Sequence, residues 1–444
     1  MNTQVYGDRI RMARVIRGIK AMDLAYELHW PPSRQTIVEQ SETVPLDRLV
    51  IAALANKLGF PEVFFTSPPG APLSPHDLLF RAPKSTTKRE VNYLTEFARI
   101  SGEVVAWLDS HHRLPPVTLP SLPSETPIAD AAERVREVLG LPSDEPIANI
   151  TYRLERAGVP VISRSQSMAE LPEKHYGYST RLGHHREQPI TILKRMDSWE
   201  RTRWTIAHEI GHLVLHGSEV PAGAEDQANR FASELLAPAE VMRDELPSLV
   251  TLTSLTDIKL RWGVSVSSLV FHLSWNALID SERTETLRKQ LYKRINPATG
   301  RTWGRDEPGS DARTPERPTM ITTWMQRCLG GTSPNLVSTL SALFPPDIIG
   351  MITGDKQQPP HSGASRTSKP SRGAQVTNLN EWRMRALFLA PLRVFCKGSP
   401  RAYRAWPLAW PLPSGPLGWQ RVSEVNGAHA RPRGRSPMQP QRLA

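Results

Sequence analysis

The sequence predicts an α+β fold that is mostly helical, and three observations lead to this fold class. Apolar residues recur at helical spacing through most of the first 354 residues. Short runs of β-branched and apolar residues interrupt them beyond residue 126, as expected for a small sheet. Pro, Ser, Gly and Arg dominate after residue 354, where hydrophobic periodicity is weak, so we expect a disordered tail. The β-type runs are 159–162, 176–180 and 189–193.

The order of these patterns predicts five segments. Pro-rich links at 67–72 and 114–127 separate a small helical unit from a mixed one. A chain of this length is also too long for one typical domain. The expected boundaries are a small all-α domain at 1–66, a helical linker region at 67–125, a domain with a short sheet at 126–292, a helical extension at 293–354 and a disordered, basic, Pro-rich tail at 355–444.

Helix positions follow from apolar spacing and from the Gly and Pro residues that end each run. In the first domain, Leu46, Leu49 and Leu58 are placed on one helix that ends before Gly59. Between residues 239 and 294 the pattern predicts two helices. The other expected helices are 10–16, 24–28, 86–110, 129–139, 147–156, 198–216 and 224–236.

Targeting signals and cysteine usage indicate the compartment. The polar first residues do not resemble a secretory signal, and no apolar stretch approaches the roughly 20 residues needed to cross a bilayer. The two cysteines, Cys328 and Cys396, form neither a disulfide framework nor a metal-type pair. We therefore expect a cytoplasmic protein with no membrane partner.

The net charge of +11 comes from the tail alone. Residues 355–444 hold 15 Lys or Arg against 3 Asp or Glu, so residues 1–354 hold 40 basic against 41 acidic side chains. Nucleic-acid binding depends strongly on positive charge. Any prediction of DNA binding by the folded part must therefore rest on a motif.

The run His208-Glu209-Ile210-Gly211-His212 is the strongest chemical signal in the chain. On a helix, two His four residues apart project from one face and can share a metal ion. Glu209 then lies beside the metal without binding it, where it can accept a proton from water. The sequence therefore predicts a metal site with Glu209 as the catalytic base.

A third ligand is expected from the carboxylates downstream. Glu225 falls on the apolar stripe of the next predicted helix, where a carboxylate needs a cation or strong donors. Glu234 points to the opposite side, Asp226 lies off the edge of the stripe, and Glu240 follows Pro238 outside the helix. Glu225 is therefore the predicted third ligand, which leaves one position open for water.

One Zn²⁺ per chain is the expected cofactor, although Mn²⁺ can occupy the same set of two His and one Glu. His216 lies about 12 Å beyond His208 along the helix, too far to bind the same ion. We interpret it as a residue behind the ligands or, preferably, as polar surface. Tyr176, Tyr178 and His216 are candidates for stabilising the oxyanion.

These residues resemble the ImmA/IrrE family of metallopeptidases. Residues 201–216 read R-x-R-W-T-x-A-H-E-I-G-H-x-x-L-H, and residues 225–238 read E-x-x-A-N-x-F-A-x-x-L-L-x-P, both as in that family. The resemblance implies a zincin-like (gluzincin) domain with His208, His212 and Glu225 as ligands and Glu209 as catalytic glutamate. It also implies a protein substrate, expected to be a transcriptional repressor of a mobile element or a stress response.

Residues 7–14, 23–25 and 33–40 resemble the Cro/C1-type (XRE) helix-turn-helix that often precedes such peptidases. The resemblance implies DNA binding through a recognition helix and a homodimer for a palindromic operator. Two departures, Trp30-Pro31-Pro32 in the turn and Ser41 in place of a common Gly, leave a protein-binding or autoinhibitory helical module as the alternative. The predicted DNA-binding residues are Ser33, Arg34, Gln35, Thr36 and Gln40.

The function expected from both resemblances is a zinc-dependent metallo-endopeptidase with a DNA-binding domain that cleaves or inactivates a repressor. The alternative is a DNA-binding transcriptional regulator whose peptidase-like domain senses metal or a partner without hydrolysing a bond. The presence of Glu209 favours the enzyme, because a pure sensor has less need of a general base. An antitoxin-type module is a third class, and it requires a toxin partner.

Overall fold

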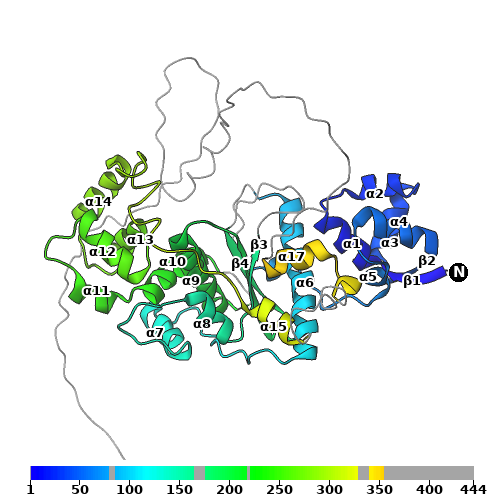
Figure 1. Ribbon diagram of the computed structural model, residues 1–444, viewed down its shortest axis with the longest axis horizontal. Coiled ribbons are helices and arrows are strands. Elements are labelled where there is room, and N and C mark those ends of the chain that lie inside the picture. Colours follow the sequence, from blue (N-terminus) through cyan, green and yellow to red (C-terminus); the bar gives the residue numbers. More distant parts are fainter. Residues whose placement is uncertain (1, 80–85, 165–175, 218–220, 329–339, 355–444) are drawn as a thin grey trace, which may run out of the picture. The chain divides into compact units, whose positions relative to one another are not determined.

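The computed structural model describes residues 2–79, 86–164, 176–217, 221–328 and 340–354. In this part of the chain helices predominate and the strands form two small sheets (Figure 1), which confirms the mostly helical α+β class. The chain divides into a unit at 1–374 and a unit at 375–444, and all described residues belong to the first. The disorder predicted for the tail lies outside the described residues. No helix in the described ranges is long and apolar enough to cross a membrane.

The N-terminal domain contains a sheet, so the prediction of an all-α domain was wrong. Its first strand pairs antiparallel with a second one about 40 residues away, with Val5 opposite Val44. Each strand is short and mostly exposed, so neither shows a clear alternating pattern in the sequence. The elements are β1 (Asn2–Tyr6), α1 (Gly7–Ile16), α2 (Ala21–Glu27), α3 (Pro32–Gln40), β2 (Thr43–Asp47), α4 (Arg48–Leu58) and α5 (Glu62–Thr66).

The second strand also corrects the helix predicted around Leu46. Leu46 lies in β2, and α4 begins after Asp47, whose carboxylate caps it by accepting a hydrogen bond from the Leu49 N–H. The side chain of Leu49 is 81% exposed, so it is no core residue. The helix ends at the predicted position, because Gly59 adopts the left-handed conformation that closes it.

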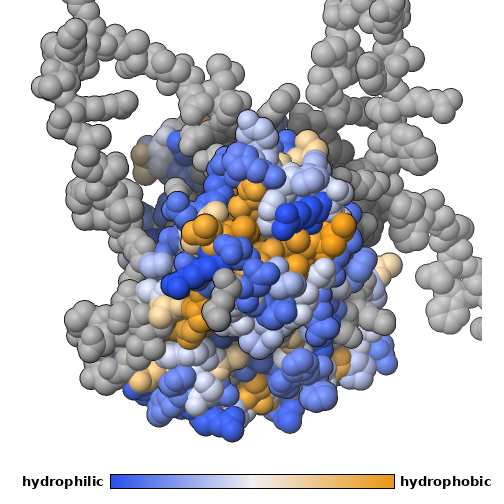
Figure 2. Space-filling view, turned by 90° about the vertical axis from the view of Figure 1, so that its right-hand side faces the viewer, coloured by the Kyte–Doolittle hydropathy of each residue, from blue (hydrophilic) through white to orange (hydrophobic). Residues whose placement is uncertain are grey.

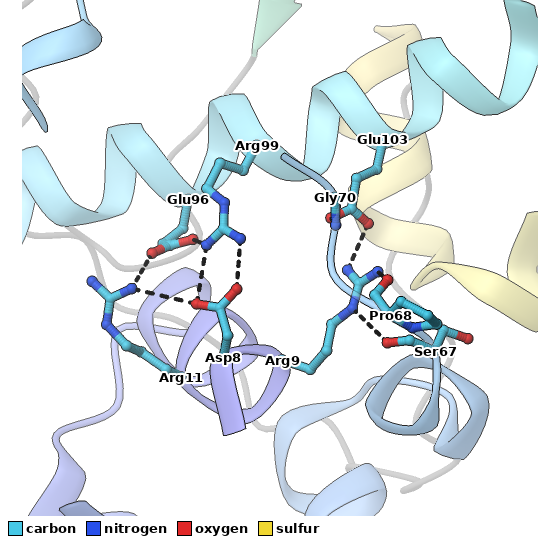
Figure 3. A network of polar contacts seen from close by, with 9 residues as sticks. All are labelled: Asp8, Arg9, Arg11, Ser67, Pro68, Gly70, Glu96, Arg99 and Glu103. Carbon is cyan, nitrogen blue, oxygen red and sulfur yellow. Dashed lines mark hydrogen bonds and ion pairs between the residues drawn. The ribbon is translucent and has the colours of Figure 1, made fainter. Parts of the chain in front are cut away.

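Helix α6 (Lys88–His111) follows the short 3₁₀ turn η1 (Pro75–Asp77) and is fastened to α1 by a network of charged groups (Figure 3). Arg99 pairs with Asp8 at 2.5 Å and with Glu96 at 2.9 Å. Arg9 pairs with Glu103 at 2.5 Å. Because Arg99, Glu96 and Arg9 are buried, removing one partner would leave an uncompensated charge. The network thus fixes α1 on α6.

The central sheet separates two hydrophobic cores. Its order is β3-β5-β4, with β5 parallel to β3 and antiparallel to β4. Tyr178, Ile190 and Ile192 belong to the core shared with α6 and the N-terminal domain, whereas Leu193 belongs to the core on the other face. Figure 1 shows the sheet between α6 and the helices α8 to α10. The strands are β3 (Val161–Arg164), β4 (Gly177–Leu182) and β5 (Gln188–Lys194).

Eight helices of the described residues surround the second core. Four of them lie between residues 239 and 293, where the sequence predicted two. Left-handed backbone at Gly263 and Ala277 breaks the apolar runs into shorter helices. The helices are α7 (Ile128–Val138), α8 (Ile150–Arg156), α9 (Trp199–Leu215), α10 (Ala224–Leu236), α11 (Ala239–Glu245), α12 (Leu252–Trp262), α13 (Val266–Trp275) and α14 (Ser281–Lys293).

The predicted helical extension contains α15 (Met320–Cys328) and α17 (Pro346–Thr353), and both contact β3. Glu155 of α8 caps α15 by accepting hydrogen bonds from the backbone N–H groups of Thr319 and Met320. Asp347, in the first turn of α17, pairs with Arg17 at the end of α1 at 2.5 Å. The extension thus packs on the sheet and contacts the N-terminal domain. The five domain boundaries themselves stay predictions.

Candidate metal centre

Helix α9 carries the histidines of the predicted site. Ser198 caps its start by accepting a hydrogen bond from the Arg201 N–H, and the helix then runs unbroken past His212. The indole of Trp204 stacks on the ring of His208, with centroids 5.2 Å apart. Nε2 of His208 lies 3.0 Å from Nε2 of His212.

Glu225 joins the two histidines from the first turn of α10. Its carboxylate oxygens lie 3.6 Å from Nε2 of His208 and 3.3 Å from Nε2 of His212. One donor atom from each residue lies within 4.8 Å of the others. His212 is fully buried, and the side chain of His208 is 12% exposed. The structure therefore brings together the three predicted ligands.

Close packing of α10 on α9 places Glu225. At Gly211 a Cβ atom would lie 2.9 Å from Cδ1 of Phe231 and 3.3 Å from Cα of Ala228, closer than packed atoms tolerate. Only Gly lets the two helices approach this closely. The glycine inside the His-Glu-x-x-His run is thus needed for the position of the third ligand.

The other carboxylates downstream do not reach the site. Asp226 pairs with Arg230 on the surface at 2.9 Å. Glu234 is buried elsewhere and accepts a hydrogen bond from the Ala239 N–H at 2.9 Å. Glu240 lies on α11 and is exposed.

Glu209 points to the sheet side of the histidines. Its Oε2 accepts a hydrogen bond of 2.8 Å from Oγ of Ser179, which in turn lies 3.2 Å from Oγ1 of Thr191. Gly177 leaves room for the carboxylate, since a Cβ there would lie 3.0 Å from Oε1. Burial raises the pKa of Glu209 to about 7. Such a carboxyl group can take up and release a proton near neutral pH.

A chain of hydrogen bonds runs from His212 through His216 to Gln227. Nδ1 of His216 lies 2.8 Å from Nδ1 of His212, and Nε2 of His216 lies 3.0 Å from Oε1 of Gln227. Gln227 also donates a hydrogen bond to the backbone oxygen of Ser124. His216 is buried, so the interpretation of His216 as polar surface was wrong. It contacts the candidate ligand His212 on the side away from Glu225 and His208, through Nδ1. Such contacts fix the ring orientation of a metal ligand.

The charges in the site fit a cation. Burial lowers the pKa of His212 to about 4, so this ligand is neutral. Burial opposes ionisation of Glu225 too, but hydrogen bonds to His208 and His212 hold its pKa below the usual range. Burial alone would lower the pKa of His208, but Glu225 and Glu209 raise it. The two carboxylates therefore favour a positive charge beside them, which a bound divalent ion can supply.

The sequence missed Ser179 and Gln227 as site residues and misjudged Tyr178. Ser179 follows Gly177 at the strand spacing of two, which puts both on the Glu209 face. Tyr178 must therefore point the other way, and its hydroxyl donates to the backbone oxygen of Leu94 at 3.0 Å. It cannot stabilise an oxyanion at this site.

The predicted DNA-binding residues lie on α3, and one of them is not available. Ser33, Arg34, Thr36 and Gln40 are exposed, and the guanidinium of Arg34 lies 4.6 Å from the Trp30 ring centroid. Gln35 is fully buried and donates a hydrogen bond to Glu39 at 2.6 Å, so it cannot reach a base edge. Its side chain serves the domain core instead.

Apolar side chains are exposed on the same domain. Met22, Tyr26, Ile37 and Leu49 are 64% to 81% exposed. Figure 2 views the end of the molecule that lies to the right in Figure 1 and shows apolar side chains gathered among hydrophilic ones. A DNA-binding surface is usually rich in positive charge rather than apolar.

One family model matches the part of the chain that contains the candidate metal ligands. No curated protein matches the chain. The model of the IrrE N-terminal-like domain, Peptidase_M78, matches residues 154–274, a range that includes Ser179, Glu209 and all three candidate ligands. This match points to a peptidase-type domain. Residues 154–274 are therefore similar to the IrrE N-terminal-like peptidase domain, which supports the resemblance to the ImmA/IrrE family.

Proposed function

We propose that this chain is a zinc-dependent endopeptidase that acts on a protein substrate, a transcriptional repressor by the resemblance of its motifs. The observation that carries the proposal is the arrangement of His208, His212 and Glu225 beside an independent carboxylate, Glu209. Two neutral imidazole nitrogens and one carboxylate oxygen are the donor set of a catalytic zinc site with one open position. The alternative function, a transcriptional regulator that senses metal without hydrolysing a bond, accounts for the three ligands but gives no role to Glu209.

Zinc bound by these three residues would polarise the scissile carbonyl group and acidify water. The residues of the chain supply the remaining steps. Glu209 accepts the proton of the attacking water on its carboxylate and later delivers it to the leaving amine. Ser179 holds Oε2 of Glu209 by its hydrogen bond, which leaves Oε1 for this proton transfer. Trp204 and His216 keep the two imidazoles in place.

The edge of β4 beside Glu209 favours an extended peptide as substrate. Strand β4 is an edge strand, and a peptide can bind such an edge as an added strand. Gly177 lies at this edge next to Glu209. Further along, the backbone oxygen of Ser179 is already taken by the Leu79 N–H at 2.7 Å. We expect the substrate to bind on the Gly177 side of this contact.

Metal content provides the first test. Purified Glu225→Ala protein should lose most of its zinc, because only two protein ligands remain, whereas the wild type should carry about one ion per chain. Asp226→Ala is the matched control, since the next carboxylate on the same helix is exposed and pairs with Arg230. Mass spectrometry of the metal checks this result. Equal zinc in both variants would contradict the site.

We also propose that the N-terminal domain binds DNA through the exposed residues of α3. Arg34→Ala should weaken binding to a selected operator by roughly 1–3 kcal/mol, because a base contact of an arginine is worth about that much. Operators can be selected from random duplexes with the full-length protein and measured by fluorescence anisotropy. A palindromic operator should be bound by a homodimer.

The exposed apolar residues favour a second candidate for this domain, a protein-binding module. If the domain is a protein-binding module, selection from random DNA duplexes enriches no sequence, and Arg34→Ala has no effect on DNA affinity. Ile37→Ser then abolishes capture of the protein partner, because Ile37 is 64% exposed on α3. The same α3 variants therefore distinguish the two candidates.

A further inference from the structure

A cavity with both polar and apolar walls lies away from the candidate metal centre, between the sheet and the helical extension. Its volume is about 210 Å³. Its walls come from β3, from the connection between β5 and α9, and from α15 and α17. The metal ligands and Glu209 do not line it. Whatever it binds is therefore separate from the catalytic site.

Two arginines line this cavity. Arg195 and Arg317 both line it, and neither forms an ion pair or a side-chain hydrogen bond with the described residues. Arg195 is half-buried and Arg317 is exposed, so both guanidinium groups are accessible to a ligand from solvent. Burial and then the charge of Arg195 lower the pKa of Arg317, opposed only by Asp197, which is exposed. Arg195 and Arg317 thus place two positive charges on the wall of one cavity.

The rest of the lining selects for a small anion with some apolar surface. The hydroxyl group of Ser163 provides a further donor, whereas that of Thr322 donates to the backbone oxygen of Thr353 at 3.4 Å. Val161, Ile321 and Ile352 form apolar walls. A guanidinium group matches the two oxygens of a carboxylate or the oxygens of a phosphate. The cavity is smaller than the pockets of about 300–1,000 Å³ that hold drug-sized ligands. A phosphate or a short carboxylic acid is the appropriate size.

We propose that this cavity is a binding site for a small oxyanion. Arg195, between β5 and α9, and Arg317, just before α15, bind the oxyanion together. Arg195 precedes α9, the helix of the metal ligands, by only a few residues. Arg317 precedes α15, and α17 contacts the N-terminal domain through Asp347 and Arg17. A bound anion therefore joins the catalytic helix to the extension. The anion stabilises the packing of α9 and the helical extension in the folded protein, so its effect is on the stability of the fold.

Thermal unfolding of the zinc-loaded full-length protein tests this site. Inorganic phosphate, acetate and succinate are added separately in the millimolar range, against sodium chloride at equal ionic strength. At least one of the three should raise the melting temperature, because a ligand that binds only the folded state stabilises it. Phosphate and the carboxylates in separate samples identify which chemical group is preferred.

Variants decide whether the effect comes from this cavity. Arg195→Ala and Arg317→Ala should each weaken anion binding roughly tenfold to a hundredfold in calorimetry, the usual effect of losing a charged hydrogen bond. Without anion, each should be at least as stable as the wild type, because a repulsion is removed. Thr322→Trp fills the cavity and should also abolish the shift, whereas Arg243→Ala, exposed on α11, should preserve it. The proposal fails if no probe acts beyond sodium chloride, or if the shift survives in the double arginine variant.

Discussion

Replacing Glu209 by Gln is expected to abolish hydrolysis while zinc stays bound. The amide keeps the size of the side chain but cannot accept the proton, and a general base contributes about 10²- to 10⁴-fold to the rate. The metal is retained because Glu209 is not among the three residues whose donor atoms converge. Substrate cleavage can be measured without knowing the repressor, by mass spectrometry of new protein N-termini in a proteome exposed to the zinc-loaded protein.

Two controls accompany this experiment. Glu240→Gln changes an exposed carboxylate on α11 and should cleave like the wild type. Zinc content should be equal in all three proteins. If wild type and Glu209→Gln give the same N-termini, the regulator without hydrolysis becomes the better explanation. If Glu209→Gln loses its zinc, the assignment of the ligands is wrong.

Replacing Lys259 by Met is expected to cause one of the largest losses of stability. The ammonium group is fully buried and lies 2.7 Å from Glu200 and 3.1 Å from Glu307. Glu307 also accepts hydrogen bonds from the N–H groups of Val266 and Ser267 at the start of α13. Without the lysine, the buried carboxylate of Glu200 and the mostly buried one of Glu307 lose their shared cation, and breaking a buried pair costs about 3–5 kcal/mol.

Urea unfolding followed by tryptophan fluorescence checks the Lys259→Met prediction. Lys289→Met is the control, because the side chain of Lys289 is 67% exposed and pairs with Glu285 at 3.5 Å. A surface pair of this kind contributes at most about 1 kcal/mol. Equal midpoints for the two variants would refute the prediction.

The cluster of candidate metal ligands was predictable because its geometry is local. His208 and His212 share a face through helix periodicity, and Glu225 stands out as a carboxylate on an apolar stripe. Ser179 was not predictable in the same way. It reaches Glu209 only after the sheet has formed and packed on α9, and no periodicity in the sequence encodes that contact.

The missed sheet and the misplaced Gln35 of the N-terminal domain also result from contacts between residues that are not sequence neighbours or from burial in the folded domain. The pairing of β1 with β2 depends on a contact between residues about 40 positions apart. Gln35 looks like a surface residue by type, yet the fold buries it against Glu39, which also pairs with Arg14 of α1. Local propensity decides the helices, whereas tertiary contacts decide which polar residues face the core.

The position of β5 between two cores has a consequence for hydrogen exchange. Its backbone N–H groups pair with β3 or β4, and its side chains are buried on both faces. Opening β5 therefore requires both cores to separate at once. We expect its amide protons to be among the last to exchange with deuterium, at rates set by global rather than local opening. Separate exchange of the N-terminal domain would instead show that the two cores unfold independently.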